Sequence, residues 1–303
     1  NMGDSVKIIK EPEITVQPYL RGKTITPQDL DDEDFSLTID KANYFAFKVD
    51  DIEEAHSHVN FQSLASDRAA YRLGDQYDQD VLGYLSGFKQ SALHGSPDTV
   101  NTTTNGSVAV STAGTDELLS SMKIDAASFG GSAGDALALQ PRTGGATDST
   151  PAVGDTFPLT VIARMSRLLD QQNVDTQGRW LVVDPVFMEL LKDEDSRLFN
   201  ADFGGSGLQN GLIGMNIHGF RVYTSNNLPT VGTGPSFTGT NSAVNYGMIV
   251  AGHDSAVATA EQINKTETYR DPDSFSDIVR GMHLYGRKIL RPEALVNAKY
   301  HLA

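Results

Sequence analysis

The sequence predicts an α+β protein in which mixed sheets pack with helices. Three observations support this class: apolar residues alternate with polar ones near both ends, a long helical pattern follows the first alternating region, and short strands and helices mix after residue 150. Because strands and helices do not alternate regularly, a doubly wound parallel sheet of the Rossmann type is disfavoured.

The first part of the chain, from Val6 to Val49, has the period of two that is typical of strands. Phe35, Leu37 and Ile39 alternate with polar residues, and the alternation returns just before residue 50. The acidic run that precedes Phe35 would be costly to bury unpaired. We therefore expect a long, exposed, hairpin-like arm that protrudes from the subunit and packs on a neighbouring copy.

A helix is predicted from Asp51 to about Phe88. Asp51 and Glu54 have the spacing of a capping box, and an apolar row with steps of four residues runs from Ala65 to Leu85. Such steps drift by about 40° each around the axis, so different elements should cover the helix along its length. The stretch contains three glycines, Gly74, Gly83 and Gly87. Each costs about 1 kcal/mol relative to Ala, which leaves a bend or an early end open.

From His94 to Asp155 the composition shifts to Gly, Ser, Thr and Ala. Short strand-like pieces are expected at Val108–Val110, Met122–Ile124 and Ala136–Leu139. The low hydrophobicity of this stretch disfavours an independent compact domain and indicates a loop-rich surface.

A second regular region begins near Phe157. The expected elements are a helix with Val161, Ile162, Met165, Leu168 and Leu169 on one face, a strand Trp180–Val183, a helix Val186–Lys192, strands Ile217–Thr224 and Tyr246–Ala251, and an Ala-rich helix Asp254–Ile263. Two long strands, Ile278–Leu290 and Ala294–His301, should follow, interrupted at Arg291-Pro292.

Composition narrows the possible functions. The 303 residues include no cysteine, so neither disulfides nor thiolate metal sites can stabilise the fold. The 39 acidic and 24 basic residues give a net charge of -15, which disfavours tight, general DNA binding. No apolar stretch approaches the roughly 20 residues of a membrane-spanning helix, and the first ten residues do not resemble a signal peptide. We expect a soluble protein with no membrane partner.

Several patterns resemble chemical sites but have simpler interpretations. Ser132 lies in a G-x-S-x-G match that would mark a hydrolase, yet no convincing buried strand precedes it. Metal ligands were considered at Glu53, Glu54, His56 and His58 and interpreted as a solvated polar face. A weak cation site at Asp271, Asp273 and Asp277 stays a minor alternative, although the set lacks the Gly and Glu of a calcium loop. We predict no catalytic residues, no metal and no cofactor.

Eight short motifs, in this order and spacing, make most of the chain similar to the major capsid proteins of tailed double-stranded DNA phages. The motifs are GDSV (3–6), LTID (37–40), YFAF (44–47), VDD (49–51), GRWLVVDP (178–185), NGLIG (210–214), GFRVY (219–223) and NNLP (226–229). The stretch from His94 to Asp155 matches poorly. The fold that this resemblance implies is the Hong-Kong-phage capsid fold, which encapsulins share.

The resemblance also implies a division of the chain. Residues 1–49 would form the E-loop, and 50–150 a P-domain with the long spine helix and the Gly/Ser/Thr-rich loop. Residues 151–282 would form the A-domain, and 283–303 strands that return to the P-domain. Six residues of the arm are predicted to contact neighbouring subunits: Tyr19, Arg21, Lys23, Asp29, Asp31 and Asp32. Lys23 is also considered for an isopeptide crosslink, with no partner residue identified.

The function implied is that of a shell subunit that assembles into hexamers and pentamers around a phage genome. Expected partners are further copies, scaffolding and portal proteins, and decoration proteins. The DNA would be enclosed without sequence-specific binding, in a virion capsid assembled in the host cytoplasm. An encapsulin-type compartment is the alternative. A secreted hydrolase or adhesin, built on the Gly/Ser/Thr-rich stretch, is a third and less favoured interpretation.

Overall fold

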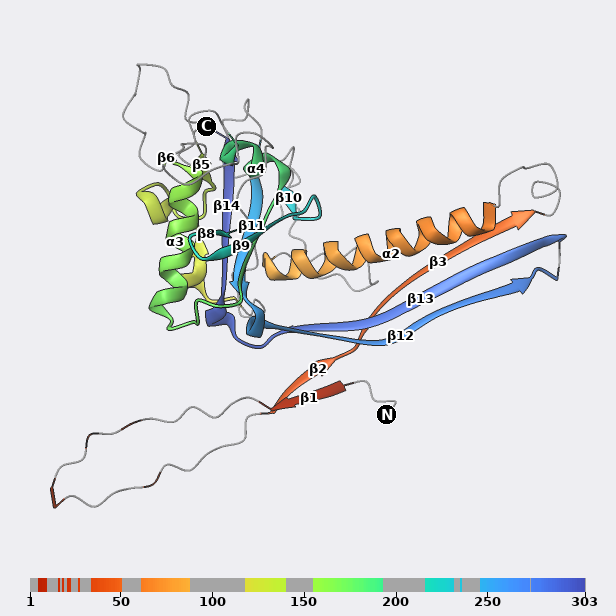
Figure 1. Ribbon diagram of the computed structural model, residues 1–303, viewed down its shortest axis with the longest axis horizontal. Helices are drawn as coiled ribbons and strands as arrows, with labels where there is room; N and C mark the ends of the chain where they lie inside the picture. Colours follow the sequence, from red (N-terminus) through yellow and green to blue (C-terminus); the bar gives the residue numbers. More distant parts are fainter. Residues whose placement is uncertain are drawn as a thin grey trace.

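The structure of the chain is a computed structural model. It describes residues 5–9, 16, 18, 21–22, 27, 34–50, 61–87, 118–139, 155–192, 216–231, 235, 246–272 and 274–302. These residues form a body, built on a large mixed sheet, and a rod, built on a small sheet and one long helix, that extends away from the body (Figure 1). A two-stranded hairpin, here called the arm stem, lies beside the junction of body and rod.

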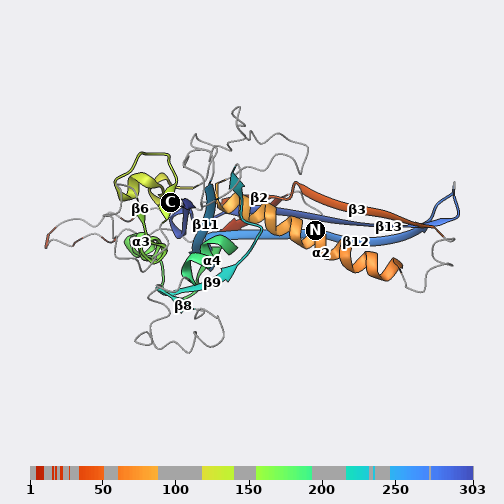
Figure 2. The same ribbon diagram turned by 90° about the horizontal axis from the view of Figure 1, so that it is seen from above.

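The rod is a three-stranded antiparallel sheet with a helix along one face. Its strands are β3 (Lys41–Asp50), β13 (Ser276–Ile289) and β12 (Val257–Arg270), with β13 in the middle. The helix, α2 (Phe61–Leu85), runs along the sheet in both views and contacts β3 and β13 (Figure 2). The long predicted helix is thus confirmed over these residues, while its expected start at Asp51 lies outside the described part of the chain.

The two faces of the rod sheet differ because side chains alternate along each strand. His283 and Tyr285 are buried on the face that α2 covers. On the opposite face, Tyr44 and Met282 are direct cross-strand partners and are 80% and 41% exposed. The rod sheet therefore has one face covered by α2 and one face, here called the open face, on which Tyr44 and Met282 are exposed.

The arm stem consists of β1 (Ser5–Ile9) and β2 (Asp34–Thr38), paired antiparallel from Ser5↔Thr38 to Ile9↔Asp34. This pairing confirms the predicted hairpin at its base. The last part of the predicted arm, Lys41–Asp50, pairs with β13 as the edge strand of the rod. Strand β3 thus belongs with α2 and not with the arm.

The body contains a nine-stranded mixed sheet. Its main path is ordered β6-β5-β14-β11-β7-β9-β8, with β10 beside β11 and β4 beside β14. The strands are β4 (Lys123–Ile124), β5 (Leu137–Leu139), β6 (Asp155–Thr156), β7 (Arg179–Val183), β8 (Asn216–Ile217), β9 (Phe220–Thr224), β10 (Thr230–Val231), β11 (Tyr246–His253) and β14 (Leu295–Leu302). Antiparallel pairs at β11 and parallel pairs at β7–β9 and β14–β5 confirm the predicted α+β class.

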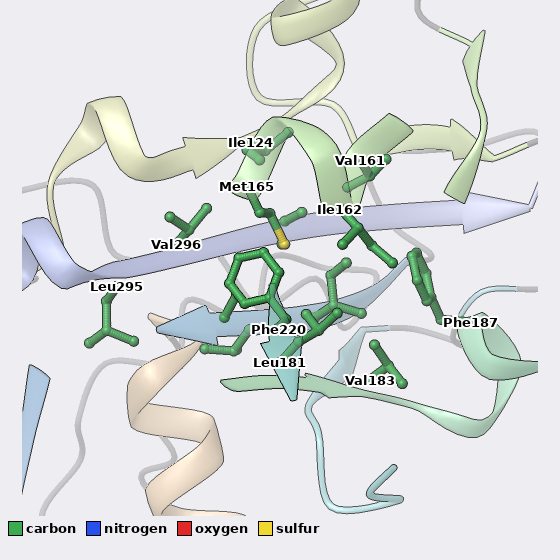
Figure 3. Close-up of a cluster of buried hydrophobic side chains, with 14 of the residues drawn as sticks. Ile124, Val161, Ile162, Met165, Leu181, Val183, Phe187, Phe220, Leu295 and Val296 are labelled. Atoms are coloured by element: carbon green, nitrogen blue, oxygen red, sulfur yellow. The ribbon is translucent and has the colours of Figure 1, made fainter. Parts of the chain in front are cut away.

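Two helices pack on this sheet and form the core with it. Helices α3 (Pro158–Gln171) and α4 (Pro185–Leu191) both begin with Pro, whose fixed φ suits the first helical turn. Ile162 and Met165 of α3 are fully buried against sheet residues such as Leu181 and Phe220 (Figure 3). Both helices and the strands Trp180–Val183 and Tyr246–Ala251 were predicted, because their apolar patterns are complete within a few residues.

The Ala-rich helix predicted at Asp254–Ile263 is wrong. A single 3-10 turn, η5 (Asp254–Ala256), is followed directly by the 14-residue strand β12. Pairing with β13 along the strand's whole length outweighs the helix propensity of the alanines. The 3-10 turns η1 (Ser120–Met122), η2 (Ala126–Phe129) and η6 (Pro292–Ala294) were not predicted, and Val108–Val110 lies outside the described residues.

The predicted C-terminal strands form, but in different parts of the molecule. Strand β13 belongs to the rod, whereas β14 lies inside the body sheet between β11 and β5. A boundary at residue 282 would cut β13 in the middle. Strand pairing therefore groups β3, α2, β12 and β13 together and places β14 with the body.

Candidate assembly interface

Of the six arm residues predicted to contact neighbours, the structure describes one. Arg21 lies in an exposed turn with Gly22, whose φ of +87° is in the left-handed region that Gly adopts readily. The other five residues, Tyr19, Lys23, Asp29, Asp31 and Asp32, lie outside the described part of the chain. The contact role of all six therefore stays a prediction.

The arm stem is attached to the rod through β13. Leu37 of β2 is 1% exposed, and its Cδ2 lies 2.9 Å from where a Cβ on Gly286 would be. The Lys288 ammonium donates to the carbonyl oxygen of Ser36 at 3.1 Å. The rest of the stem contributes little to this attachment, because Val6 and Lys7 are exposed.

Helix α2 is attached to the opposite side of the same strand by a buried ion pair. The Arg287 guanidinium donates two hydrogen bonds to the Asp80 carboxylate, Nε to Oδ2 at 2.7 Å and Nη2 to Oδ1 at 2.8 Å. Both side chains are almost fully buried, at 6% and 0% exposed. The guanidinium carbon also lies 4.4 Å from the centre of the Tyr84 ring, in a cation–π contact. A buried pair with two parallel hydrogen bonds fixes the position of α2 relative to β13.

Aromatic side chains continue this contact along the rod. The Tyr285 hydroxyl donates to Asp80 at 3.0 Å, and its ring meets Tyr77 of α2 edge to face at 4.8 Å. Burial, and then the nearby Asp80 carboxylate, raise the pKa of Tyr285, so its hydroxyl stays protonated and remains a donor. His283 stacks on Tyr285 at 5.1 Å, with Glu261 of β12 3.6 Å from its Nε2. The cluster could not be predicted from the sequence, because α2 is far along the chain from β12 and β13.

The open face of the rod combines apolar side chains with cross-strand ion pairs. Besides Tyr44 and Met282, this surface includes Tyr269, which is 41% exposed and lies 5.0 Å from the Arg280 guanidinium. Arg280 donates a hydrogen bond to Glu267 at 2.9 Å. The pKa of Glu267 is lowered most by the hydrogen bond from Lys265 and next by this bond from Arg280. Exposed aromatic residues with paired charges around them are typical of protein–protein contact surfaces.

The far end of the rod, at the turn between β12 and β13, carries the exposed aromatic residue Phe275, at 81%. Behind it, Lys48 of β3 bonds to Asp271 at 2.8 Å, and the Ser274 hydroxyl donates to the same carboxylate at 2.6 Å. Asp277 accepts from Arg270. Two of the three proposed cation ligands thus face basic side chains, and Asp273 lies outside the described residues.

The other site-like patterns lead to no described chemical centre. Ser132 lies in an exposed turn between η2 and β5, whereas a nucleophile elbow needs a strand before the serine and a helix after it. Glu53, Glu54, His56 and His58 lie outside the described part of the chain. Among the residues that are described, no group of three or more His, Asp or Glu is arranged to hold a metal ion. None of the described helices is long and apolar enough to cross a membrane.

The body is joined to the rod at the end of α2. The Asn297 side chain of β14 donates to the carbonyl oxygen of Ser86 at 2.9 Å, and both residues are buried. On the same strand, the Tyr300 hydroxyl donates to Asp184, which also caps α4 by accepting from the Phe187 amide at 3.0 Å. Burial raises the pKa of Asp184, and the bonds from Tyr300 and Phe187 partly offset that rise. Body and rod therefore meet at the buried bond between Asn297 and Ser86, while the bonds of Asp184 lie within the body.

Comparisons with known proteins identify relatives of this arrangement. A family model described as "Phage capsid protein" matches residues 32–298. None of the curated proteins compared with the chain matches it.

Solved structures are similar over nearly the whole chain. A structure from Mycobacterium phage Che8 is 25% identical, with a TM-score of 0.62 over 98% of this chain and 84% of that one. The capsid of cyanophage P-SCSP1u is 17% identical, with a TM-score of 0.64 over 99% and 84% of the two chains. The capsid of Ralstonia phage GP4 is 14% identical, with a TM-score of 0.63 over 100% and 85%. The last two likenesses establish the fold alone.

Proposed function

Because this chain belongs to the phage capsid protein family and is the structural major capsid protein of a tailed phage, we propose that its copies close the shell through the arm and the open face of the rod. The observation that supports this route is the unequal cover of the rod, whose inner face is packed by α2 while Tyr44 and Phe275 remain 80% and 81% exposed. Apolar surface of this kind is stabilised when another copy removes it from water.

We propose a division of the chain that follows strand pairing. The arm, up to residue 40, is the E-loop, and α2 is the spine helix of a P-domain that also contains β3, β12 and β13. The body, including β14, is the A-domain. This division moves residues 41–49 from the expected E-loop to the P-domain. It also places β12 and all of β13 in the P-domain and β14 in the A-domain, according to the strands with which they pair.

Within the arm, we retain Tyr19, Arg21, Lys23, Asp29, Asp31 and Asp32 as the residues that contact a neighbouring subunit. The acidic members suit basic side chains on a neighbour. Oppositely charged surfaces increase the rate and specificity of association more than its strength. A crosslink through Lys23 would need a partner residue that neither sequence nor fold indicates.

The wider assembly follows from the same role. Hexamers and pentamers of this chain would form the shell in the host cytoplasm, with scaffolding, portal and decoration proteins as further partners. A net charge of -15 suits a wall that encloses DNA without sequence-specific binding, because attraction to phosphate is weak. We propose no catalytic activity, and the exposed turn around Ser132 supports this view. The family match favours the phage role over an encapsulin-type compartment or a secreted hydrolase or adhesin.

The experiment that tests this function replaces residues 10–33 with Asn-Gly. These two residues suit the tight turn that would join Ile9 to Asp34, which are already paired. We expect the variant to fold, with an unchanged circular dichroism spectrum outside the loss of the arm, and to fail to close normal shells in electron micrographs. Scaffolding protein is co-expressed in both cases.

A matched control keeps the arm at its full length but replaces residues 10–33 with a Gly/Ser linker. If side-chain contacts drive assembly, this control also fails, whereas an arm that acts only as a spacer would restore shells. Normal shells from the Asn-Gly variant, or a wild-type protein that stays monomeric with scaffolding protein present, would contradict the proposal.

A further inference from the structure

Four consecutive residues of β13 lie between α2 and the arm stem. Side chains of a strand alternate between its two faces. Tyr285 and Arg287 both bond to Asp80 of α2. Gly286 and Lys288 face the other way and meet β2. Helix α2 and strand β2 of the arm stem therefore pack on opposite faces of the same short segment of β13.

The crossing at Gly286 is too close for any side chain. The pairing of β3 with β13 ends at Lys41↔Tyr285. The segment that precedes β3, which connects it to β2, crosses β13 at Gly286. A Cβ on Gly286 would lie 2.3 Å from the Thr38 carbonyl oxygen, 2.9 Å from Leu37 Cδ2 and 3.0 Å from Ile39 Cα. Two of these atoms belong to the backbone and cannot rotate away. A glycine inside a strand often marks such a close approach of another backbone.

From this arrangement we infer that residues 285–288 form a two-sided joint that couples the direction of the arm to the position of α2. A displacement of the strand at Gly286 also displaces Tyr285 and Arg287, its direct chain neighbours. Their geometry with Asp80 is specific, since the guanidinium makes two parallel bonds to the carboxylate. A change of arm direction thus disturbs the helix contact, and loss of the helix contact loosens the arm. This coupling belongs to the single subunit and goes beyond the assembly role.

The test is amide hydrogen exchange in purified subunits. Gly286→Ala should lower protection of β2 by about tenfold and of α2 residues 77–85 by about threefold, because the strand moves relative to Asp80. Lys288→Met, which removes the bond to Ser36, should change both segments in the same direction by less. The matched control is Gly281→Ala in the same strand, where the three atoms nearest to the added Cβ all belong to the side-chain ring of Phe45 and none to the backbone. It should leave the arm stem unchanged.

The reciprocal variant is Asp80→Asn, which weakens the pair with Arg287 from the helix side. It should lower protection of β2 as well as of α2. In the double variant with Lys288→Met the two changes should not multiply, since both act on the same joint. The inference is overturned if Gly286→Ala loosens the arm alone, if Asp80→Asn leaves the arm unchanged, or if the double variant is multiplicative. Should Gly286→Ala not fold, the other two variants decide the question. Normal shell assembly by a loosened variant would not affect this conclusion.

Discussion

The body and the rod are stabilised in different ways. In the body, side chains such as Ile162, Met165 and Phe187 are completely buried and touch mainly other apolar groups. In the rod, the contact between α2 and the sheet centres on a charged pair, Asp80 and Arg287, surrounded by aromatic rings. The body can therefore exclude water by itself, whereas the rod holds a defined geometry and leaves aromatic side chains such as Tyr44 exposed.

The largest effect is expected from a cavity in the body. Phe187→Ala removes a ring that is fully buried and meets Tyr300 edge to face at 5.3 Å. Such truncations cost about 3–5 kcal/mol, measured as the free energy of unfolding in urea. The control is Phe275→Ala at the tip of the rod, which should leave subunit stability nearly unchanged. Equal losses in the two variants would mean that the rod tip is as well packed as the core.

A slightly smaller and more local effect is expected from the rod. Asp80→Ala leaves the buried Arg287 without its carboxylate, and breaking such a pair costs about 3 kcal/mol or more. The value should be near the lower end because the Tyr84 ring still faces the cation. Hydrogen exchange should locate the loss in α2, β13 and the arm strand β2, with the body sheet unaffected. Asp67→Ala, on the exposed side of α2, serves as the control. Global unfolding by Asp80→Ala would erase the distinction between the two regions.

A pH-dependent effect should identify the polar contact at the edge of the body core. Burial raises the pKa of Asp184 above the ordinary 3.8, so this carboxyl binds its proton more tightly in the folded than in the unfolded state. The contribution of this group to stability is therefore fully present below the unfolded pKa and is lost as pH rises through the folded pKa. Relative to Asp184→Asn, the wild-type protein should be more stable near its acid limit than at neutral pH. A difference between the two proteins that is independent of pH would contradict this assignment.

The smallest effect is expected on the open face of the rod. Hydrogen bonds from Lys265 and Arg280 lower the pKa of Glu267, so its contribution is present above the unfolded pKa and is lost as pH falls through the folded pKa. Because this carboxylate is exposed, solvent and salt screen the interaction. Glu267→Gln should leave subunit unfolding unchanged but alter the salt dependence of assembly, measured by light scattering. A clear loss of subunit stability would show that the face is structural and not a contact surface.

Elements with a complete local pattern could be predicted from the sequence. Helix α3 has its apolar residues on one face, and Asp184-Pro185 combines an N-cap with a first-turn proline. The error at residues 254–263 has a physical cause, because alternate alanines suit a strand as well as a helix once a long partner strand is available. The partner, β13, follows β12 closely, but its pattern alone did not show where it pairs.

The contacts that matter for the rod could not be predicted in this way. Asp80 and Arg287 are 207 residues apart, and nothing local links them. Two signals were present but ambiguous. Asp80 stands next to Val81 in the apolar helical row, and Gly286 stands in a strand between Tyr285 and Arg287. Each indicates a special neighbour, but only the fold identifies which one.

The position of β14 in the body has a consequence for synthesis on the ribosome. This strand follows all the others of its sheet in the sequence, yet it lies between β11 and β5 in the middle of the sheet. The body sheet can be completed only after β14 has left the exit tunnel. Until then, the earlier strands of the body lack a central strand of their sheet. Such long-range pairing is slow. A nascent chain that stops before β14 thus leaves the hydrophobic edge of β11 unpaired, where chaperones and proteases can act on it before it reaches a growing shell.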